Sequence, residues 1–338
     1  MNITVYGIAK NEQHFAKRFA QSVSDADRVV ICDTGSTDKT IPILRKHGVE
    51  VHGIQVNPFR FDLARNLALQ HVQDADVVVS MDIDEVALPG WREQIANAWK
   101  SGTTMVRYPF VHNWEDKKQT VPRLSVWGFK VHCPKTYVWK YPMHETLELA
   151  NHSLTDNVVT INNELFRHYP DNDKQERWSR IALLQYATKD DPQDQRMAHL
   201  YGRELFFHHK YEEAITELKR HLSITTPYLD PQGDVEGIGQ TRATTCRLIA
   251  QSLMALNGSP DEILIWLLRS VSESPSQREP WMHLADAWYR VGDYTAALAA
   301  IERGLLLVNK YASTEIEEWC WDDRVHQLHN KIKPLVAS

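Results

Sequence analysis

The chain has 338 residues, of which 43% are hydrophobic and 24% charged, and its formal net charge is −6 at pH 7. This composition is typical of an ordinary globular chain with one or two domains, each able to bury a core. It excludes an integral membrane protein, because no apolar run approaches the roughly 18 residues of a membrane-spanning helix. The first predicted strand begins too early for a signal peptide, so we expect a cytoplasmic protein without a transmembrane segment.

Strands and helices alternate through the first part of the chain. The expected elements are a strand at 3–8, a helix at 14–23, a strand at 28–32, a helix ending at 47, a strand at 49–52, a helix at 61–73 and a strand at 77–79. Such alternation predicts a parallel sheet with crossover helices, whose ligands bind beyond the carboxyl ends of the strands. Asp33, Asp82 and Asp84 follow such ends. Gly35 and Ser36 are expected to shape the turn after Asp33, and the alternative is that Ser36 or Thr37 is the N-cap of the helix that ends at 47.

The segment Asp82–Asp84 follows a buried β-branched strand. On an extended backbone, side chains two residues apart point to the same side, so the two carboxylates are expected to converge. Like charges at such a distance repel unless a cation lies between them, and Mg²⁺ and Mn²⁺ prefer oxygen ligands. The alternative is an acidic strand-to-loop turn without a metal.

Four motifs occur in the order Lys10–Glu12, Asp33–Asp38, Ala64–Asn66 and Asp82–Asp84, each at a strand end or a helix start. Together they resemble family 2 glycosyltransferases of the GT-A fold, and the resemblance extends to His168. It implies a nucleotide-sugar donor, a divalent metal, Mn²⁺ or Mg²⁺, and inversion at the anomeric carbon of the sugar.

The resemblance also implies roles for single residues around the metal. Asp84 matches the direct metal ligand, and His168 lies in the position of a further ligand. Asp82 matches a residue that faces the ribose or reaches the metal through water. The resemblance places His144 beside the catalytic centre, behind the residues that contact substrate.

The nucleotide is expected to contact Asn11, Asp33 and Arg65. By resemblance, Asp33 accepts a hydrogen bond from a uracil ring. Arg65 suits the base or the pyrophosphate, because a guanidinium binds planar, bidentate partners. Its alternative role is an ion pair with Asp62 or Asp33.

An inverting transfer needs a general base, for which a carboxylate is the usual choice. Glu145 is the candidate, and Glu115 and Asp116 are the alternatives. Aromatic side chains stack on sugars, and the candidates for the acceptor site are Trp114, Trp127 and Trp139, each of which has a core or anchoring role as its alternative.

Beyond residue 171 the sequence reads as helices with an internal repeat. Gly202 precedes Ala214, and Ala285 precedes Ala297, each by 12 residues, with a degenerate unit around Ala250. This pattern resembles tetratricopeptide repeats, in which small residues let paired helices pack closely. Such repeats bind partners, so acceptor recognition, self-association as a homodimer, or simple support of the catalytic domain is expected.

The sequence therefore predicts two domains, a catalytic domain at 1–170 and a helical domain at 171–338. The extra residues of the degenerate unit are assigned to Thr226–Gly239, and Glu315–Lys331 is expected to form a terminal helix. The fold class is α/β: a GT-A, Rossmann-like mixed sheet, followed by an all-α tetratricopeptide-like repeat domain.

The distribution of charged residues along the chain limits the partners it can bind. Residues 1–160 carry 18 Lys and Arg against 18 Asp and Glu, and residues 161–338 carry 20 against 26. An acidic second half disfavours non-specific nucleic-acid binding. A basic strip leaves modified DNA or another anionic acceptor as a possible partner, and its alternative is a solvated loop face. The strip comprises Lys117, Lys118, Arg123, Lys130, Lys135 and Lys140. The four cysteines lack the paired spacing of a zinc or disulfide framework.

The function expected from these features is metal-dependent, inverting transfer of a sugar from a UDP-sugar. The acceptor is a peptide or protein, an envelope saccharide, or a modified nucleobase, with the first two favoured. The alternative from another class is a non-catalytic scaffold whose repeats bind a peptide. A nucleotidyltransferase is disfavoured, because Gly7–Lys10 is a poor phosphate-binding loop.

Overall fold

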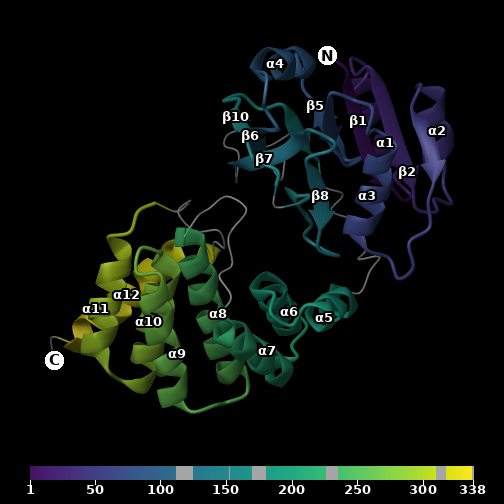
Figure 1. Ribbon diagram of the computed structural model, residues 1–338. Helices are drawn as coiled ribbons and strands as arrows, with labels where there is room; N and C mark the ends of the chain where they lie inside the picture. Colours follow the sequence, from purple (N-terminus) through teal and green to yellow (C-terminus); the bar gives the residue numbers. More distant parts are fainter. Residues whose placement is uncertain (112–124, 152, 170–179, 226–234, 310–316, 337–338) are drawn as a thin grey trace. The chain divides into compact units, whose positions relative to one another are not determined.

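A computed structural model describes residues 1–111, 125–151, 153–169, 180–225, 235–309 and 317–336 (Figure 1). The chain divides into two compact units, Met1–Trp178 and Ser179–Ser338. The described part of the first unit is built on a mixed sheet, and that of the second is helical. This combination confirms the fold class predicted from the sequence.

The first unit contains a nine-stranded sheet in its described residues, and a separate hairpin. The strands are β1 (Ile3–Ala9), β2 (Arg28–Asp33), β3 (Glu50–Gly53), β4 (Val77–Ser80), β5 (Glu85–Ala87), β6 (Met105–Val111), β7 (Ser125–His132), β8 (Tyr137–Lys140), β9 (Thr146–Leu149), β10 (Val158–Thr160) and β11 (Phe166–His168). The order is β3-β2-β1-β4-β7-β6-β11-β5, β10 pairs with β6, and β8 and β9 form the hairpin.

The first four strands of this order are parallel, as the alternation of strands and helices predicts. β7 then pairs antiparallel with both β4 and β6, and β11 pairs antiparallel with β5. The carboxyl end of β4 therefore faces chain segments that come from much later in the sequence.

Both faces of the parallel strands are buried, which explains their continuous β-branched runs. Ile3 and Val5 of β1 belong to one hydrophobic core, and Tyr6 belongs to a second core on the opposite face. The helices of this unit are α1 (Gln13–Ser22), α2 (Thr40–Lys46), α3 (Phe61–Gln70) and α4 (Trp91–Ala98). Ala68 and Leu69 of α3 close the second core, so α3 lies against the sheet beside the end of β4.

Gly7 lies where β1 meets the chain leaving β4. A Cβ at this position would lie 2.2 Å from the Met81 carbonyl oxygen and 3.3 Å from Ile31. We expect Gly7→Ala to lower the free energy of unfolding by about 1–3 kcal/mol, because a backbone atom cannot move aside as a flexible side chain would. Gly53→Ala is the control, since its Cβ would meet nothing within 4 Å. Urea unfolding of both variants tests this, and equal stabilities would contradict it.

The second unit consists of helical hairpins (Figure 1). Its elements are α5 (Arg180–Asp190), α6 (Gln195–Phe207), α7 (Tyr211–Ser223), α8 (Val235–Ala255), α9 (Pro260–Glu273), α10 (Arg278–Val291), α11 (Tyr294–Leu305), the 3₁₀ turn η2 (Glu318–Cys320) and α12 (Asp323–Val336). α6 pairs with α7, α8 with α9, and α10 with α11.

The small residues of the repeat lie where paired helices touch. A Cβ on Gly202 would meet the Leu218 side chain at 2.6 Å, and Ala214, Ala285 and Ala297 are fully buried. Ala250 is buried in the same core. The spacing of 12 residues thus reflects the close approach of two helices in each hairpin, as predicted.

Two boundaries in this unit differ from the sequence predictions. α8 begins at Val235, so the end of the segment Thr226–Gly239 is helical; its first nine residues lie outside the described part of the chain. The terminal helix runs from Asp323 to Val336 and not from 315 to 331. The 3₁₀ turn Glu318–Cys320 comes before it, where Cys320 is buried and ends the turn. Within the described residues, no helix is both long and apolar enough to cross a membrane.

Candidate active site

Arg65 connects two carboxylates at the end of β4. Its Nη2 donates to Asp82 Oδ1 at 2.7 Å and its Nε donates to Glu145 Oε1 at 2.6 Å. The Arg65 side chain is only 6% exposed. Because α3 begins at Phe61, Arg65 falls on the face of the helix that points at the sheet, and its guanidinium lies over the Trp139 ring. One buried cation therefore positions both Asp82 and the candidate base Glu145.

Asn66, which follows Arg65 in the sequence, explains how Glu145 is held beside Arg65. The side chain of Asn66 donates to the Trp139 carbonyl at 2.8 Å and accepts from the Trp139 amide at 2.9 Å. This pair of bonds fixes α3 to β8, whose hairpin with β9 carries Glu145 just before Thr146. The Arg65–Asn66 dipeptide thus joins two segments that are distant in sequence.

The alternative ion pair of Arg65 with Asp62 or Asp33 is wrong. Asp62 accepts two hydrogen bonds from Arg60, at 3.1 and 2.7 Å, because both side chains lie at the start of α3. Arg65 points instead across the sheet end, toward Asp82 and Glu145.

Lys130 on β7 is a second cation in this network. Its Nζ lies 3.0 Å from Asp82 Oδ2 and 2.6 Å from Glu85 Oε1. Burial opposes ionisation of Asp82, yet the charges of Arg65 and Lys130 outweigh it and hold the pKa of Asp82 well below its ordinary value. Burial raises the pKa of Glu85, despite the attraction of Lys130. This environment therefore favours the ionised form of Asp82 more than that of Glu85.

Lys130 was placed in a basic surface strip by the sequence, and this placement is wrong. Lys117, Lys118 and Arg123 lie outside the described residues, and Lys135 and Lys140 are exposed. Lys130 alternates inward on β7, and the antiparallel pairing of β7 with β4 brings it to Asp82.

Asp84 meets His168 on the other side of the turn. The His168 Nε2 lies 3.3 Å from Asp84 Oδ2, and both side chains are mostly buried. The antiparallel register of β11 against β5 pairs His168 with Glu85, and the Tyr169 amide donates to the Asp84 carbonyl at 3.0 Å. A carboxylate from the turn between β4 and β5 and an imidazole from β11 therefore lie together, and they suit a divalent cation such as Mn²⁺.

The backbone around Asp82 is a turn and not the expected extended strand. The Glu85 amide donates to the Asp82 carbonyl at 3.0 Å, and the Glu85 carboxylate accepts from the Asp82 amide at 3.0 Å. The rule that alternate residues share a side fails here, because β4 ends at Ser80. Asp82 faces Arg65 and Lys130, whereas Asp84 faces His168.

Asp33 and Asn11 form a joint between the loops that follow β1 and β2. Asp33 Oδ1 accepts from the amides of Gly35 and Ser36 at 2.9 and 2.8 Å, and its other oxygen accepts from the Ser36 hydroxyl. Asn11 Oδ1 accepts from the Thr37 amide at 2.7 Å. These bonds shape the loop that would receive a nucleotide. The N-cap predicted at Ser36 or Thr37 is wrong, since α2 starts at Thr40.

A buried chain of hydrogen bonds lies beneath Arg65. Trp139 Nε1 donates to the Tyr6 hydroxyl at 2.7 Å, and the Tyr6 hydroxyl lies 2.9 Å from His132 Nε2. His132 Nδ1 donates to the Cys133 carbonyl at 3.0 Å. Trp139 is 5% exposed, so the expectation that it faces an acceptor sugar is wrong. Trp127 is 41% exposed and carries Arg107 over its ring, while Trp114, Glu115 and Asp116 lie outside the described residues.

His132 makes the stability of this unit dependent on pH. Burial lowers the pKa of His132 to about 4, against about 6.5 in an unfolded chain. Between these values the unfolded chain binds a proton that the folded one excludes, so stability falls as the pH drops from about 6.5 to 4, by roughly 3 kcal/mol in total. His132→Gln cannot titrate and should flatten this dependence. Urea unfolding from pH 7 to pH 4.5 measures it, and parallel curves for the two chains would rule out the effect.

Comparison with known proteins gives one clear match. A sequence model of the family described as glycosyl transferase family 2 matches residues 4–172. No curated protein matches the chain. The matched range covers all the strands of the mixed sheet, and it includes Asp84, Glu145 and His168.

Solved structures give weaker similarities. The chain is 14% identical to Pseudomonas aeruginosa PilF, covering 46% of this chain and 60% of that one, with a TM-score of 0.36. It is 22% identical to Mycobacterium tuberculosis glucosyl-3-phosphoglycerate synthase, solved with Mn²⁺, UDP and glucosyl-3-phosphoglycerate, covering 32% of this chain and 44% of that one, with a TM-score of 0.29. The chain thus spans less than two thirds of either protein, and with TM-scores this low neither similarity carries an argument about function.

Proposed function

The chain belongs to glycosyl transferase family 2, and on that premise we propose that its first unit transfers a sugar from a UDP-sugar to an acceptor with a divalent cation, Mn²⁺ or Mg²⁺. The observation that carries this proposal is the contact between Asp84 Oδ2 and His168 Nε2, 3.3 Å apart. It joins a carboxylate from the turn after β4 and an imidazole from β11 at the end of the sheet, where such folds bind ligands.

The donor site is proposed around three carboxylates and two cations. Arg65, Lys130, Asp82, Glu85 and Glu145 are linked by ion pairs, and Asp84 lies next to them with His168. Asp84 and His168 would hold the cation, which when bound neutralises the charge that develops on a departing diphosphate. Asp82 would contact the ribose, while Asn11 and Asp33 shape the loop for the base.

Glu145 is proposed as the general base. Its carboxylate is 13% exposed and is fixed by the Nε of Arg65 at 2.6 Å, which leaves its second oxygen for an acceptor. As the acceptor attacks the anomeric carbon from the face opposite the diphosphate, its proton passes to Glu145, and the configuration at that carbon inverts. Arg65 keeps the carboxylate in place throughout.

The helical unit is proposed to recognise the acceptor, with a peptide or protein and an envelope saccharide as the favoured classes. The support is its hairpin architecture, which in repeat proteins forms binding surfaces. Incubation of the enzyme and labelled UDP-sugar with peptides, saccharides and modified DNA, separately, identifies the class by the label it takes up. Sedimentation of the chain alone tests self-association through the repeats.

Calorimetric titration tests the donor proposal. UDP and a panel of UDP-sugars are titrated into the chain with Mn²⁺, and again with EDTA. We expect metal-dependent binding that favours one sugar, with GDP and CDP as controls that bind more weakly. Absence of UDP binding under both conditions, by a folded chain, would remove the UDP assignment and favour another nucleotide donor or the non-catalytic scaffold.

A further inference from the structure

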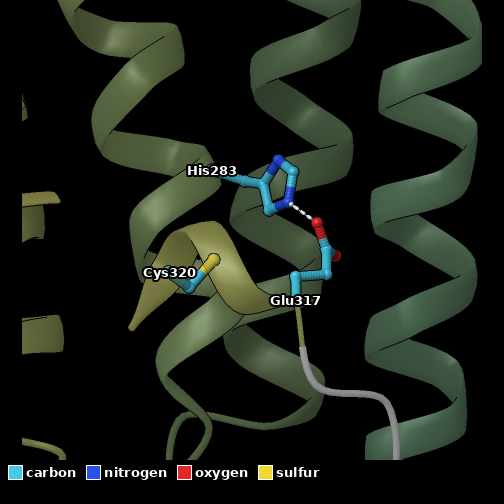
Figure 2. A group of neighbouring side chains, drawn as sticks. All are labelled: His283, Glu317 and Cys320. Atoms are coloured by element: carbon cyan, nitrogen blue, oxygen red, sulfur yellow. Dashed lines mark hydrogen bonds and ion pairs between the residues drawn. The ribbon is translucent and has the colours of Figure 1, made fainter. Parts of the chain in front are cut away.

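A histidine, a glutamate and a cysteine meet inside the helical unit (Figure 2). His283 lies on α10, Glu317 directly precedes η2, and Cys320 ends η2. One ligand atom from each side chain lies within 4.8 Å of those of the other two, and His283 Nε2 is 2.7 Å from Glu317 Oε2. None of these three residues is assigned to sugar transfer.

The cluster is built into the fold and is mostly buried, and its most exposed member is Glu317, at 28% side-chain exposure. Cys320 is fully buried and His283 is 9% exposed. Glu317 and Cys320 are three residues apart, and a 3₁₀ turn places residues at that spacing on one side. His283 is 34 residues before Glu317, so the linear spacing gives no sign of the group.

A second observation is a buried carboxylate near this cluster in sequence whose hydrogen bonding is incomplete. Glu279 lies one helical turn before His283 and is fully buried. Its Oε1 accepts from Trp321 Nε1 at 2.8 Å, but its Oε2 has no hydrogen-bond partner among the described residues. A buried carboxylate oxygen without a partner is costly.

Arg247 partly neutralises the negative charge of Glu317, because it pairs with only one of the two carboxylate oxygens. Its Nε lies 3.1 Å from Glu317 Oε1, the oxygen that does not face His283. Arg247 therefore binds one oxygen of Glu317 and leaves the other, Oε2, to His283. Trp319 Nε1, at 3.2 Å from the same oxygen, is a neutral donor.

We propose that His283, Glu317 and Cys320 bind one Zn²⁺ ion that ties α10 to η2. Imidazole, carboxylate and thiolate together are the ligands zinc prefers, whereas Mg²⁺ and Ca²⁺ select oxygen alone. Zinc–ligand bonds of about 2.0–2.3 Å place ligand atoms roughly 3.5 Å apart, so the side chains need shifts on the order of 1 Å. Binding displaces the Cys320 thiol proton to solvent. The Nε2 proton that His283 donates to Glu317 moves to Nδ1 or to solvent, and water fills the fourth position.

Cobalt is the probe, because a cysteine thiolate bound to Co²⁺ gives a charge-transfer band in the near ultraviolet. The full chain is freed of metal with EDTA and titrated with Co²⁺. We expect the band to saturate at one Co²⁺ per chain and to disappear on addition of Zn²⁺. The ligands proposed for the donor-site cation are the Asp84 carboxylate and the His168 imidazole, so its occupancy gives no thiolate band and the test is independent of the proposed sugar transfer.

Three variants and a control locate the site. Cys320→Ser should abolish the band, and His283→Gln and Glu317→Gln should each weaken Zn²⁺ binding by at least about tenfold, measured by competition with a chromophoric chelator. Cys246→Ser, which removes another buried cysteine of the same unit, should leave band and affinity unchanged. His283→Gln still decides the matter if Cys320→Ser does not fold. A wild-type chain without the band, or a band that survives in Cys320→Ser, overturns the proposal.

Discussion

Asp84→Asn is expected to abolish metal-dependent donor binding and to lower the rate of sugar transfer by at least about 10²–10³-fold. The amide keeps the shape of the carboxylate but loses the negative charge that a divalent cation requires beside His168. The fold should survive, because the link from β11 to this turn is a backbone bond from the Tyr169 amide to the Asp84 carbonyl. Calorimetric titration of UDP with Mn²⁺, followed by a transfer assay, measures both effects.

Asp74→Asn is the matched control, since the Asp74 side chain is 75% exposed and its contact with Arg28 is at the surface. It should bind UDP as the wild-type chain does. His168→Gln should show the same loss of metal dependence as Asp84→Asn. It removes an imidazole ligand, whereas Asp84→Asn removes a negative charge. An Asp84→Asn chain that still binds UDP only in the presence of Mn²⁺ would show that the cation is held elsewhere.

The strands near the start of the chain were predictable, because their pattern is local. Ile3–Ala9 and Val77–Ser80 are buried on both faces. The run of apolar residues in each segment predicts this burial without knowledge of the fold. The small residues of the last helical hairpin are readable for the same reason. Ala285 and Ala297 mark the contact of two helices that follow one another in the chain.

The candidate site was predictable only in part, because its contacts are long-range. The resemblance placed Asp84 and His168 together, and the register of β11 against β5 brings them to 3.3 Å. Nothing local in the sequence indicates that Lys130 would reach Asp82, since this depends on β7 entering the sheet beside β4. The partner of Arg65 was mistaken for the same reason: Asp62 is near in sequence, and Glu145 is near in space.

The turn at Asp82–Asp84 shows a different limit. Periodicity predicts which side a residue faces only while the strand continues, and β4 ends at Ser80. The amide of Glu85 then bonds back to the Asp82 carbonyl, which sends the two aspartates to different partners. A helix start is also hard to place from hydroxyl residues alone, because Asp38 accepts from the Thr40 amide at 2.9 Å and moves the start of α2 beyond Thr37.

Glu145→Gln is expected to keep donor binding and to lower transfer by about 10²–10⁴-fold, the usual contribution of a general base. Gln can still accept the hydrogen bond from Arg65 Nε, and Arg65 keeps its ion pair with Asp82 at 2.7 Å, so the site should stay assembled. What the amide cannot do is take the acceptor proton. Calorimetry should therefore give the wild-type affinity for UDP with Mn²⁺, while the transfer rate at saturating donor falls.

Glu148→Gln on β9 is the matched control, because it makes the same chemical change three residues further along the hairpin. It should transfer sugar at close to the wild-type rate. Asp116→Asn and Glu115→Gln separate the two remaining alternatives: if either carboxylate were the base, its variant and not Glu145→Gln would lose transfer. A Glu145→Gln chain that transfers at the wild-type rate removes Glu145 as the base. A Glu145→Gln chain that instead fails to bind donor would mean that this carboxylate serves to hold Arg65 and Asp82 for the nucleotide.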